Sequence, residues 1–160
     1  ALQSILISGN KPLRLQSRDD PAKTRGILPD YVCMVTAFLD LHEATQNTQR
    51  TEDWLADAKK IQHAADECFW DRANAGYFGV ERPIFDGFPR MKVATDTDLP
   101  NANAVATMNL LRLWKLTGQN SYRDKADALL GALGPQITQA PQSHATWATL
   151  LRKRALMEQN

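Results

Sequence analysis

Two stretches of the sequence, Leu28–Gln46 and Asp96–Gly118, constrain the fold more than any other feature. Each begins with short polar residues and a proline and continues as a predicted helix whose side chains are apolar nearly all round. The second stretch stops at a glycine. A helix without a polar face has to be surrounded by protein, so we expect two inner helices, the first beginning with Asp30 as N-cap and the second covering Asn103–Thr117. The fold class predicted from this pattern is all-α.

Each inner helix is followed by a predicted amphipathic helix, which buries only one face. The first of these begins with Thr51 as N-cap, and Glu52 and Asp53 occupy its first turn. The second begins at Ser121, carries Asp124 as a variant of the capping box, and ends at Gly134-Pro135. A last helix is expected at about Ser143–Met157.

The two halves of the helical region are an internal repeat. Phe38-Leu39-Asp40-Leu41 aligns with Leu110-Leu111-Arg112-Leu113, and beyond a polar turn Trp54 aligns with Tyr122 and Ala58 with Ala126. Each copy is an inner helix, a turn and an outer helix, which is a repeated αα-hairpin. Hairpins stacked side by side in this way curve into an arc, and an ordinary helix bundle is the alternative.

Two segments fall outside the repeat. Residues 1–28 are predicted to be an extended or mobile N-terminal segment with a strand-like piece at Leu2–Ser8, ahead of a helical-hairpin segment at 29–157. Residues 70–92 are rich in glycine, proline and aromatic side chains. This composition predicts turns and a short β-hairpin-like insertion, with strand character near Tyr77–Val80.

Composition excludes several classes of function. The 19 basic and 18 acidic residues nearly cancel, which gives no electrostatic case for a nucleic acid or an anionic membrane as partner. No apolar run approaches the ~20 residues that span a bilayer. Cys33 and Cys68 lie among apolar residues, so we expect two buried thiols in a reducing compartment, the cytoplasm. The sequence contains no metal-binding motif, phosphate loop or nucleophile elbow, and it implies no cofactor.

An ordered set of motifs gives the chain a family resemblance. PDY before an apolar helix is followed by WL-x-x-A, FWD-x-x-x-x-GYF, LPNANAVA and L-x-R-L-x-x-LTG. Over about residues 28–157 this set resembles the C-terminal region of the thioredoxin-domain proteins related to spermatogenesis-associated protein 20. The chain departs from the usual family pattern at Pro29 and at Asn101-Ala102, where that family has an aspartate and a Ser-Gly pair.

The resemblance implies a fold and a class of activity. It implies an arc of a six-hairpin (α/α)6-type toroid, similar to those of N-acylglucosamine 2-epimerases and six-hairpin glycosidases. The thioredoxin-like head and its CxxC motif are absent from this sequence, so no redox activity is implied. Because two and a half hairpins cannot close such a ring, we expect a fragment or processed piece that self-associates or joins the rest of a larger toroid.

A polar site is expected at the rim of such a toroid, where the inner helices begin. Asp30 and Asp96 are the candidate catalytic carboxylates, as a glycosidase needs two across the scissile bond. The candidate substrate-binding residues sit at the two helix starts and in a basic stretch that the resemblance supplies: Tyr31, Arg90, Lys92, Asn101 and Asn103.

Other roles remain open for these residues and for their neighbours. Helix capping alone explains Asp30 and Asn103, and a core position suits Tyr31. Trp70, Tyr77 and Phe78 are candidates for an aromatic platform. His144 is the one histidine near the rim that could serve an epimerase as acid or base.

These observations lead to two hypotheses about function. The first is a segment of a carbohydrate-handling toroid of the epimerase or glycosidase type, whose specific activity is unassigned and either retained or vestigial. The second is a non-catalytic helical-repeat module that binds protein, because a partial arc leaves apolar helix faces to cover.

Overall fold

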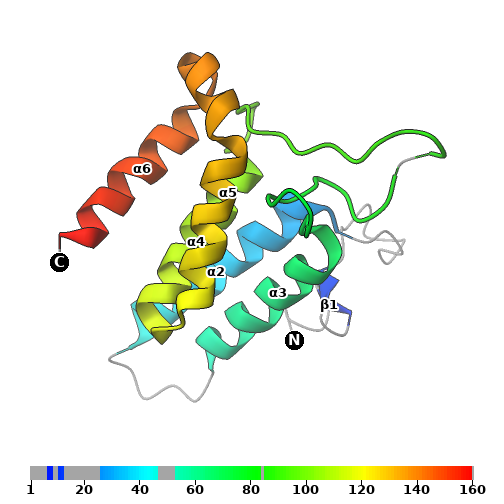
Figure 1. Cartoon of the computed structure of the whole chain (residues 1–160). Helices are drawn as coiled ribbons and strands as arrows, with labels where there is room; N and C mark the ends of the chain where they lie inside the picture. Colours follow the sequence, from blue (N-terminus) through cyan, green and yellow to red (C-terminus); the bar gives the residue numbers. More distant parts are fainter. Residues whose placement is uncertain (1–6, 9–10, 13–25, 47–52, 84, 160) are drawn as a thin grey trace.

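The computed structural model describes residues 7–8, 11–12, 26–46, 53–83 and 85–159. Within them the regular secondary structure is helical apart from one short pair of strands, which confirms the all-α class, and the described stretch between residues 69 and 102 is irregular (Figure 1). The elements are β1 (Ile7–Ser8), β2 (Lys11–Pro12), α2 (Leu28–Thr45), α3 (Trp54–Phe69), α4 (Ala102–Thr117), α5 (Asn120–Gln139), the 3-10 turn η1 (Pro141–Ser143) and α6 (Ala145–Glu158). β1 and β2 are antiparallel, with Ile7 opposite Pro12. Most of the predicted N-terminal segment lies outside the described residues. This includes residues 2–6 of the strand-like piece expected at Leu2–Ser8.

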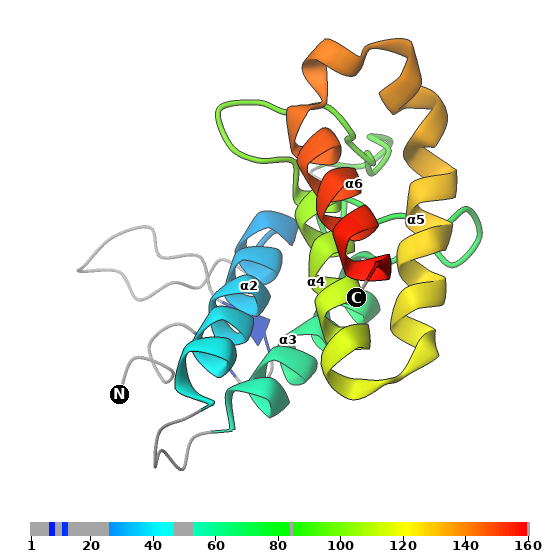
Figure 2. The same cartoon turned by 90° about the vertical axis from the view of Figure 1, so that its left-hand side faces the viewer.

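The α-helices of the described ranges pack as two hairpins and a fifth helix. α2 packs against α3, α4 packs against α5, and α4 also contacts both α2 and α6. Figure 2 shows α4 between α2 and α6. The two helices that the sequence predicts to be inner are therefore neighbours, and each is backed by its own amphipathic helix.

The core lies between these layers and accounts for the apolar character of α2 and α4. Tyr31, Val35 and Leu39 of α2 and Leu110 and Leu113 of α4 are fully buried. Each such side chain contributes roughly 1.5–3 kcal/mol when it leaves water. Within this chain, however, α2 is not surrounded. On the flank that faces away from the core, four residues are exposed: Cys33, Ala37, Asp40 and Leu41. The expectation that Cys33 is buried is therefore wrong, whereas Cys68 is buried as expected, and both thiols are free.

The caps of the first three long helices differ in part from the predictions. Asp30 is not the N-cap of α2 but sits in its first turn, where its carboxylate accepts a hydrogen bond of 2.7 Å from the Ile27 N–H. Asp53, rather than Thr51, caps α3 by accepting from the Ala56 N–H at 2.9 Å. Thr51 and Glu52 lie outside the described residues. α4 ends as predicted at Gly118, in the left-handed conformation that favours glycine (φ 70°).

α5 begins at Asn120, one residue before the predicted start, and runs through Gly134-Pro135 to Gln139. Proline inside a helix removes one backbone hydrogen bond and crowds the preceding turn. The helix continues because Leu133 on one side of the proline is buried and Ile137 on the other packs against the core. The Thr138 hydroxyl lies 3.1 Å from the carbonyl oxygens of both Gly134 and Pro135.

The segment after α3 forms a tight turn rather than strands of its own. Trp70 and Tyr77 make an isolated antiparallel bridge, and the Phe78 N–H donates to the Phe69 carbonyl at 2.9 Å. This geometry resembles the predicted hairpin, but no continuous strand forms among its described residues. Residues 79–83 and 85–101 are irregular and lead back to the start of α4 (Figure 1).

Candidate functional site

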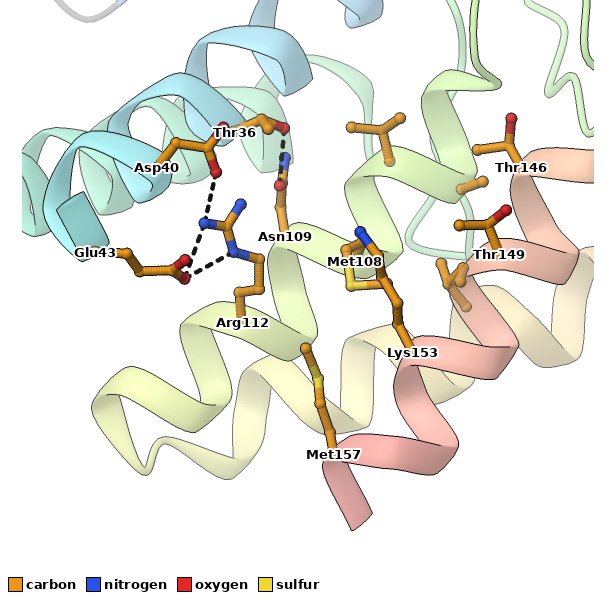
Figure 3. Close-up of a pocket in the computed structure, with 13 residues that line it drawn as sticks. Thr36, Asp40, Glu43, Met108, Asn109, Arg112, Thr146, Thr149, Lys153 and Met157 are labelled. Carbon is orange, nitrogen blue, oxygen red and sulfur yellow. Dashed lines mark hydrogen bonds and ion pairs between the residues drawn. The ribbon is translucent and has the colours of Figure 1, made fainter. Parts of the chain in front are cut away.

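A cavity of about 540 Å³ opens between α2, α4 and α6. We call it the polar cavity, after the charged and hydroxyl side chains that Figure 3 shows on all three helices. Its lining consists of Thr36, Asp40, Glu43, Ala104, Val105, Met108, Asn109, Arg112, Thr146, Thr149, Leu150, Lys153 and Met157. Pockets that bind small molecules typically have volumes of about 300–1,000 Å³, so the cavity is large enough for a small ligand.

An arginine shared by two carboxylates closes one side of the polar cavity. Arg112 on α4 donates from Nη2 to Asp40 Oδ1 at 2.7 Å and from Nε to Glu43 Oε1 at 3.1 Å. The Arg112 side chain is only 13% exposed, whereas the Asp40 and Glu43 side chains are 64% and 50% exposed. The carboxylates therefore keep acceptor capacity toward water or a ligand while they hold the guanidinium in place.

A second polar contact joins the same two helices deeper in the cavity. The Thr36 hydroxyl donates to Asn109 Oδ1 at 3.0 Å, and Asn109 Nδ2 donates to the Val32 carbonyl at 2.9 Å. Asn109 is buried, and these bonds satisfy its amide on both sides. The positions of Thr36 and Asn109 are thus fixed before any ligand arrives.

α6 supplies the opposite wall. Figure 3 shows the Lys153 and Met157 side chains extending from α6 toward α4. Lys153 makes no ion pair within the described part of the chain, so its ammonium group is available to a ligand. Met108 and Met157 add flexible apolar surface.

The predicted site residues around the start of α4 form a separate cluster. Asn103 is buried. Its Oδ1 accepts from the Tyr77 N–H at 2.9 Å, and its Nδ2 donates to the Tyr77 carbonyl at 3.0 Å. The side chain thus makes the two hydrogen bonds that a neighbouring β-strand would make to Tyr77. Asn101 is the N-cap of α4, accepting from the Ala104 N–H at 3.1 Å. Both amides also donate to the Val93 carbonyl, each at 3.1 Å.

Asp96 joins this cluster to α6. Its two oxygens accept from the Asn101 N–H at 3.0 Å and from the Thr146 N–H, in the first turn of α6, at 2.9 Å. Burial opposes ionisation of the Asp96 carboxyl, but the hydrogen bonds from Thr146 and Asn101 and the proximity of His144 outweigh it and lower its pKa. Asp96 therefore caps a helix that lies some fifty residues away in sequence.

Asp30 and Tyr31 lie at the start of α2. Tyr31 is fully buried, and its ring meets Phe69 edge-on with centroids 4.9 Å apart. No hydrogen bond or ion pair in the described ranges links Asp30 directly to Asp96, Asn101 or Asn103. The arrangement therefore gives Asp30 a capping contact and Tyr31 a core position.

Arg90 and Lys92 hold the loop that follows α3. The Lys92 ammonium group contacts Asp71 Oδ2 and the Ala75 carbonyl, each at 2.8 Å, and its hydrogen bond is the main cause that holds the Asp71 pKa well below its usual range. The Arg90 guanidinium lies 3.9 Å from the centre of the Phe78 ring and donates to the Glu81 carbonyl at 3.1 Å. Both cations have local partners, and neither lines the polar cavity.

The proposed aromatic platform does not line the polar cavity either. Tyr77 is fully buried, and its hydroxyl donates to Asp66 Oδ1 at 2.5 Å. Burial first, and then the charge of Asp66, raises the pKa of Tyr77. Trp70 packs edge-on against Tyr77. His144 is buried, with Nδ1 at 2.6 Å from the Ala140 carbonyl and no partner for Nε2 within the described structure.

Sequence reasoning missed the residues that line the polar cavity, of which the most polar are Thr36, Asp40, Glu43, Asn109, Arg112 and Lys153. One signal was present: Asp40 and Arg112 occupy aligned positions of the repeat and carry opposite charges. Aligned positions on adjacent inner helices lie side by side, so opposite charges there indicate a contact. In the residues described, no group of three or more His, Cys, Asp or Glu side chains is arranged to hold a metal ion. No helix among them has the length and apolarity to cross a bilayer.

Comparison with known proteins gives a consistent set of relatives. The chain is 38% identical over 117 residues to spermatogenesis-associated protein 20 of Homo sapiens, and equally so to the Rattus norvegicus protein. It is 29% identical over 129 residues to an uncharacterized protein of Caenorhabditis elegans. No protein-family model matches the chain.

The mammalian matches cover 72% of this chain but only 14% of the relatives. The nematode match covers 81% of the chain and 17% of that protein. What the whole relatives do is therefore no guide by itself to what this region does. The 38% identity over 72% of the chain supports the spermatogenesis-associated protein 20 family as the family of the matched region.

Proposed function

We propose that this chain is part of an α/α toroid and that its polar cavity binds a carbohydrate. The alternation of α2 and α4 with α3 and α5, and the position of α6 beside α4, suit an arc of inner and outer helices. In such an arc the polar cavity would face the centre of the ring. The single observation that carries the proposal is a cavity of about 540 Å³ whose lining combines polar side chains from three helices with apolar surface.

The chemistry of the lining favours a neutral, hydroxyl-rich ligand. Asp40 and Glu43 carry two negative charges, and Arg112 and Lys153 carry two positive charges, so the formal charges cancel. Sugar hydroxyls both donate and accept hydrogen bonds, and this lining offers carboxylate acceptors and an ammonium donor. The methionines supply the apolar contact that a sugar ring also needs, in place of the aromatic platform expected from the sequence.

Binding rather than hydrolysis is the activity that we propose. Asp40 and Glu43 project from successive turns of one helix, and both contact Arg112. A glycosidase instead places its two carboxylates on opposite sides of the scissile bond. Asp30 and Asp96 do not enter this proposal, because both accept hydrogen bonds from backbone N–H groups at helix starts.

Calorimetric titration of the 160-residue chain with methyl glycosides and short oligosaccharides tests the proposal. We expect saturable binding of at least one sugar, and a loss of about tenfold or more in affinity for Lys153→Met, since a charged hydrogen bond is worth roughly 1.5–3 kcal/mol. Lys115→Met is the matched control, because Lys115 is exposed on α4 and does not line the polar cavity. Silence across the panel, or equal losses in the two variants, would contradict the proposal.

A protein-binding module is the second candidate, and exposed apolar side chains favour it. Phe85 and Leu99 in the loop before α4 are 62% and 67% exposed, and Leu156 on α6 is 50% exposed. Sedimentation velocity distinguishes this candidate through self-association. A sedimentation coefficient that rises with protein concentration would favour it, and a constant value for the monomer would count against it.

A further inference from the structure

A second cavity of about 360 Å³ adjoins the polar cavity. We call it the apolar cavity, and its lining consists of Pro29, Val32, Cys33, Thr36, Ala37, Asp40, Leu99, Pro100, Ala102 and Val105. Thr36, Asp40 and Val105 line both cavities. The two are therefore parts of one groove that follows the exposed flank of α2.

The two parts of the groove differ in chemistry. In the apolar cavity the one charged residue is Asp40, and it stands at the junction with the polar cavity. On the α2 side of the apolar cavity the lining residues Cys33 and Ala37 are exposed. On the side of the loop before α4, Leu99 is 67% exposed. Water in contact with such apolar walls is displaced favourably by an apolar group.

We propose that the ligand is an amphiphilic glycoside, with its sugar in the polar cavity and an alkyl or acyl chain in the apolar cavity. This inference rests on the proposed function and adds a chain to the sugar. The junction at Thr36, Asp40 and Val105 is where the glycosidic or acyl linkage would lie. A polar ligand alone would leave the apolar half of a continuous groove unfilled.

Cys33 offers a reporter for this half of the groove. Its thiol is exposed and lines the apolar cavity, whereas Cys68, the other cysteine, is buried. The residue as a whole is exposed, but its surroundings partly desolvate the thiol; this desolvation first, and then the nearby charge of Asp30, raise the pKa of Cys33. Alkylation is therefore best followed at mildly alkaline pH, where more thiolate is present. A chain that fills the apolar cavity should slow this reaction, and a sugar without a chain should not.

The test compares methyl and hexyl glycosides of the same sugars by calorimetry and by the rate of Cys33 alkylation. Each methylene that leaves water is worth about 0.8 kcal/mol, or roughly fourfold in affinity, so even partial burial predicts a hexyl advantage of about tenfold or more. Hexyl glycosides alone should protect Cys33. Ala37→Trp, which fills the apolar cavity, should abolish the hexyl advantage and leave methyl glycoside binding intact. Ala44→Trp on the same helix is the control, because Ala44 is exposed and lines neither cavity.

The outcomes separate this inference from the proposed function. Equal affinity for methyl and hexyl glycosides, with no protection of Cys33, overturns the amphiphile and leaves carbohydrate binding in place. Binding of neither overturns both. Hexanol that binds and protects as well as the hexyl glycoside shows that the sugar contributes nothing, which again overturns both. If Cys33 alkylation slows as the protein concentration rises, without any glycoside present, a second copy of the chain covers this flank of α2. That outcome overturns the amphiphile.

Discussion

Asn103 shows how one buried amide can stabilise a loop that has no strands. It satisfies both backbone groups of Tyr77 and, with Asn101, the Val93 carbonyl. A strand neighbour would normally make such contacts along a ladder. Here one side chain at the start of α4 makes them, and so the loop after α3 is tied to the inner helix.

Replacing Asn103 by alanine should therefore be costly. The Tyr77 N–H and carbonyl would remain buried without their partner, and each such group costs roughly 1–3 kcal/mol. We expect Asn103→Ala to lower the free energy of unfolding by about 2–4 kcal/mol in urea titrations. Asn120→Ala, at an exposed position of α5, should change it by less than about 0.5 kcal/mol. A loss below about 1 kcal/mol for Asn103→Ala would show that the loop does not depend on this amide.

Asp96→Asn should destabilise the chain in a pH-dependent manner. The amide retains one acceptor but places N–H groups against backbone donors, so we expect a loss of about 1–2 kcal/mol at neutral pH. Since the pKa of Asp96 is lowered on folding, its contribution is complete above the unfolded value of about 3.9 and is lost as the pH falls through the folded value. Urea titrations should show the gap between wild type and variant narrowing below about pH 4. A constant gap would contradict this, and exposed Asp98→Asn is the control.

Replacing a glycine by alanine should have opposite effects on stability inside a helix and just after its end. Gly131 lies inside α5, and a β-carbon added there would meet no atom within 4 Å beyond its chain neighbours and the backbone of its own helix. Gly131→Ala should therefore stabilise the chain by about 0.5–1 kcal/mol. Gly118→Ala should destabilise it by roughly 1 kcal/mol, because the residue has φ 70°. Thermal unfolding of both variants measures the two signs, and a stabilising Gly118→Ala would contradict the left-handed end of α4.

The Arg112 cluster joins two hairpins, so its energy belongs to the contact between α2 and α4. Both carboxylates are at least half exposed, and solvent screening keeps such pairs near 0.2–1 kcal/mol each. A double-mutant cycle with Arg112→Met and Asp40→Asn should give a coupling of roughly 0.5–1 kcal/mol. No coupling would mean that the Arg112–Asp40 ion pair adds nothing measurable, and that any contribution of Arg112 comes from Glu43 or from its packed stem.

The existence of the helices was predictable here, whereas only some of their ends were. The apolar periodicity located all five α-helices of the described residues, and Gly118 ended α4 as expected. Gly134-Pro135 did not end α5, because burial on both sides of the proline outweighs one lost hydrogen bond. Asp53 rather than Thr51 caps α3: either residue type can cap a helix, so residue type alone did not fix the start, and α3 begins at Trp54, which packs against the core.

The site was harder to predict than the fold, for a reason that applies to the whole molecule. No helix begins directly after Asp96 in the sequence, yet its carboxylate caps α6. A local sequence pattern cannot reveal a partner that lies fifty residues away. Arg112 and Lys153 look like solvated helix charges when each helix is considered alone. Only the packing of α2, α4 and α6 turns them toward a common cavity. The repeat alignment of Asp40 with Arg112 was the one available clue.

Amide hydrogen exchange should reflect the position of each helix in this arrangement. α4 packs against α2, α5 and α6, whereas α6 packs chiefly against α4 and leaves Leu151 and Leu156 about half exposed. Amides open locally at a cost set by the packing that protects them. We therefore expect the slowest exchange in the middle of α4, near Leu110, and the fastest helical exchange in the C-terminal half of α6, as measured by mass spectrometry of peptic fragments.

A partner that covers α6 would slow the exchange of its amides. If exchange in α6 is as slow as in α4 and depends on protein concentration, copies of the chain associate through that helix. Equal protection at all concentrations would instead contradict the central position of α4.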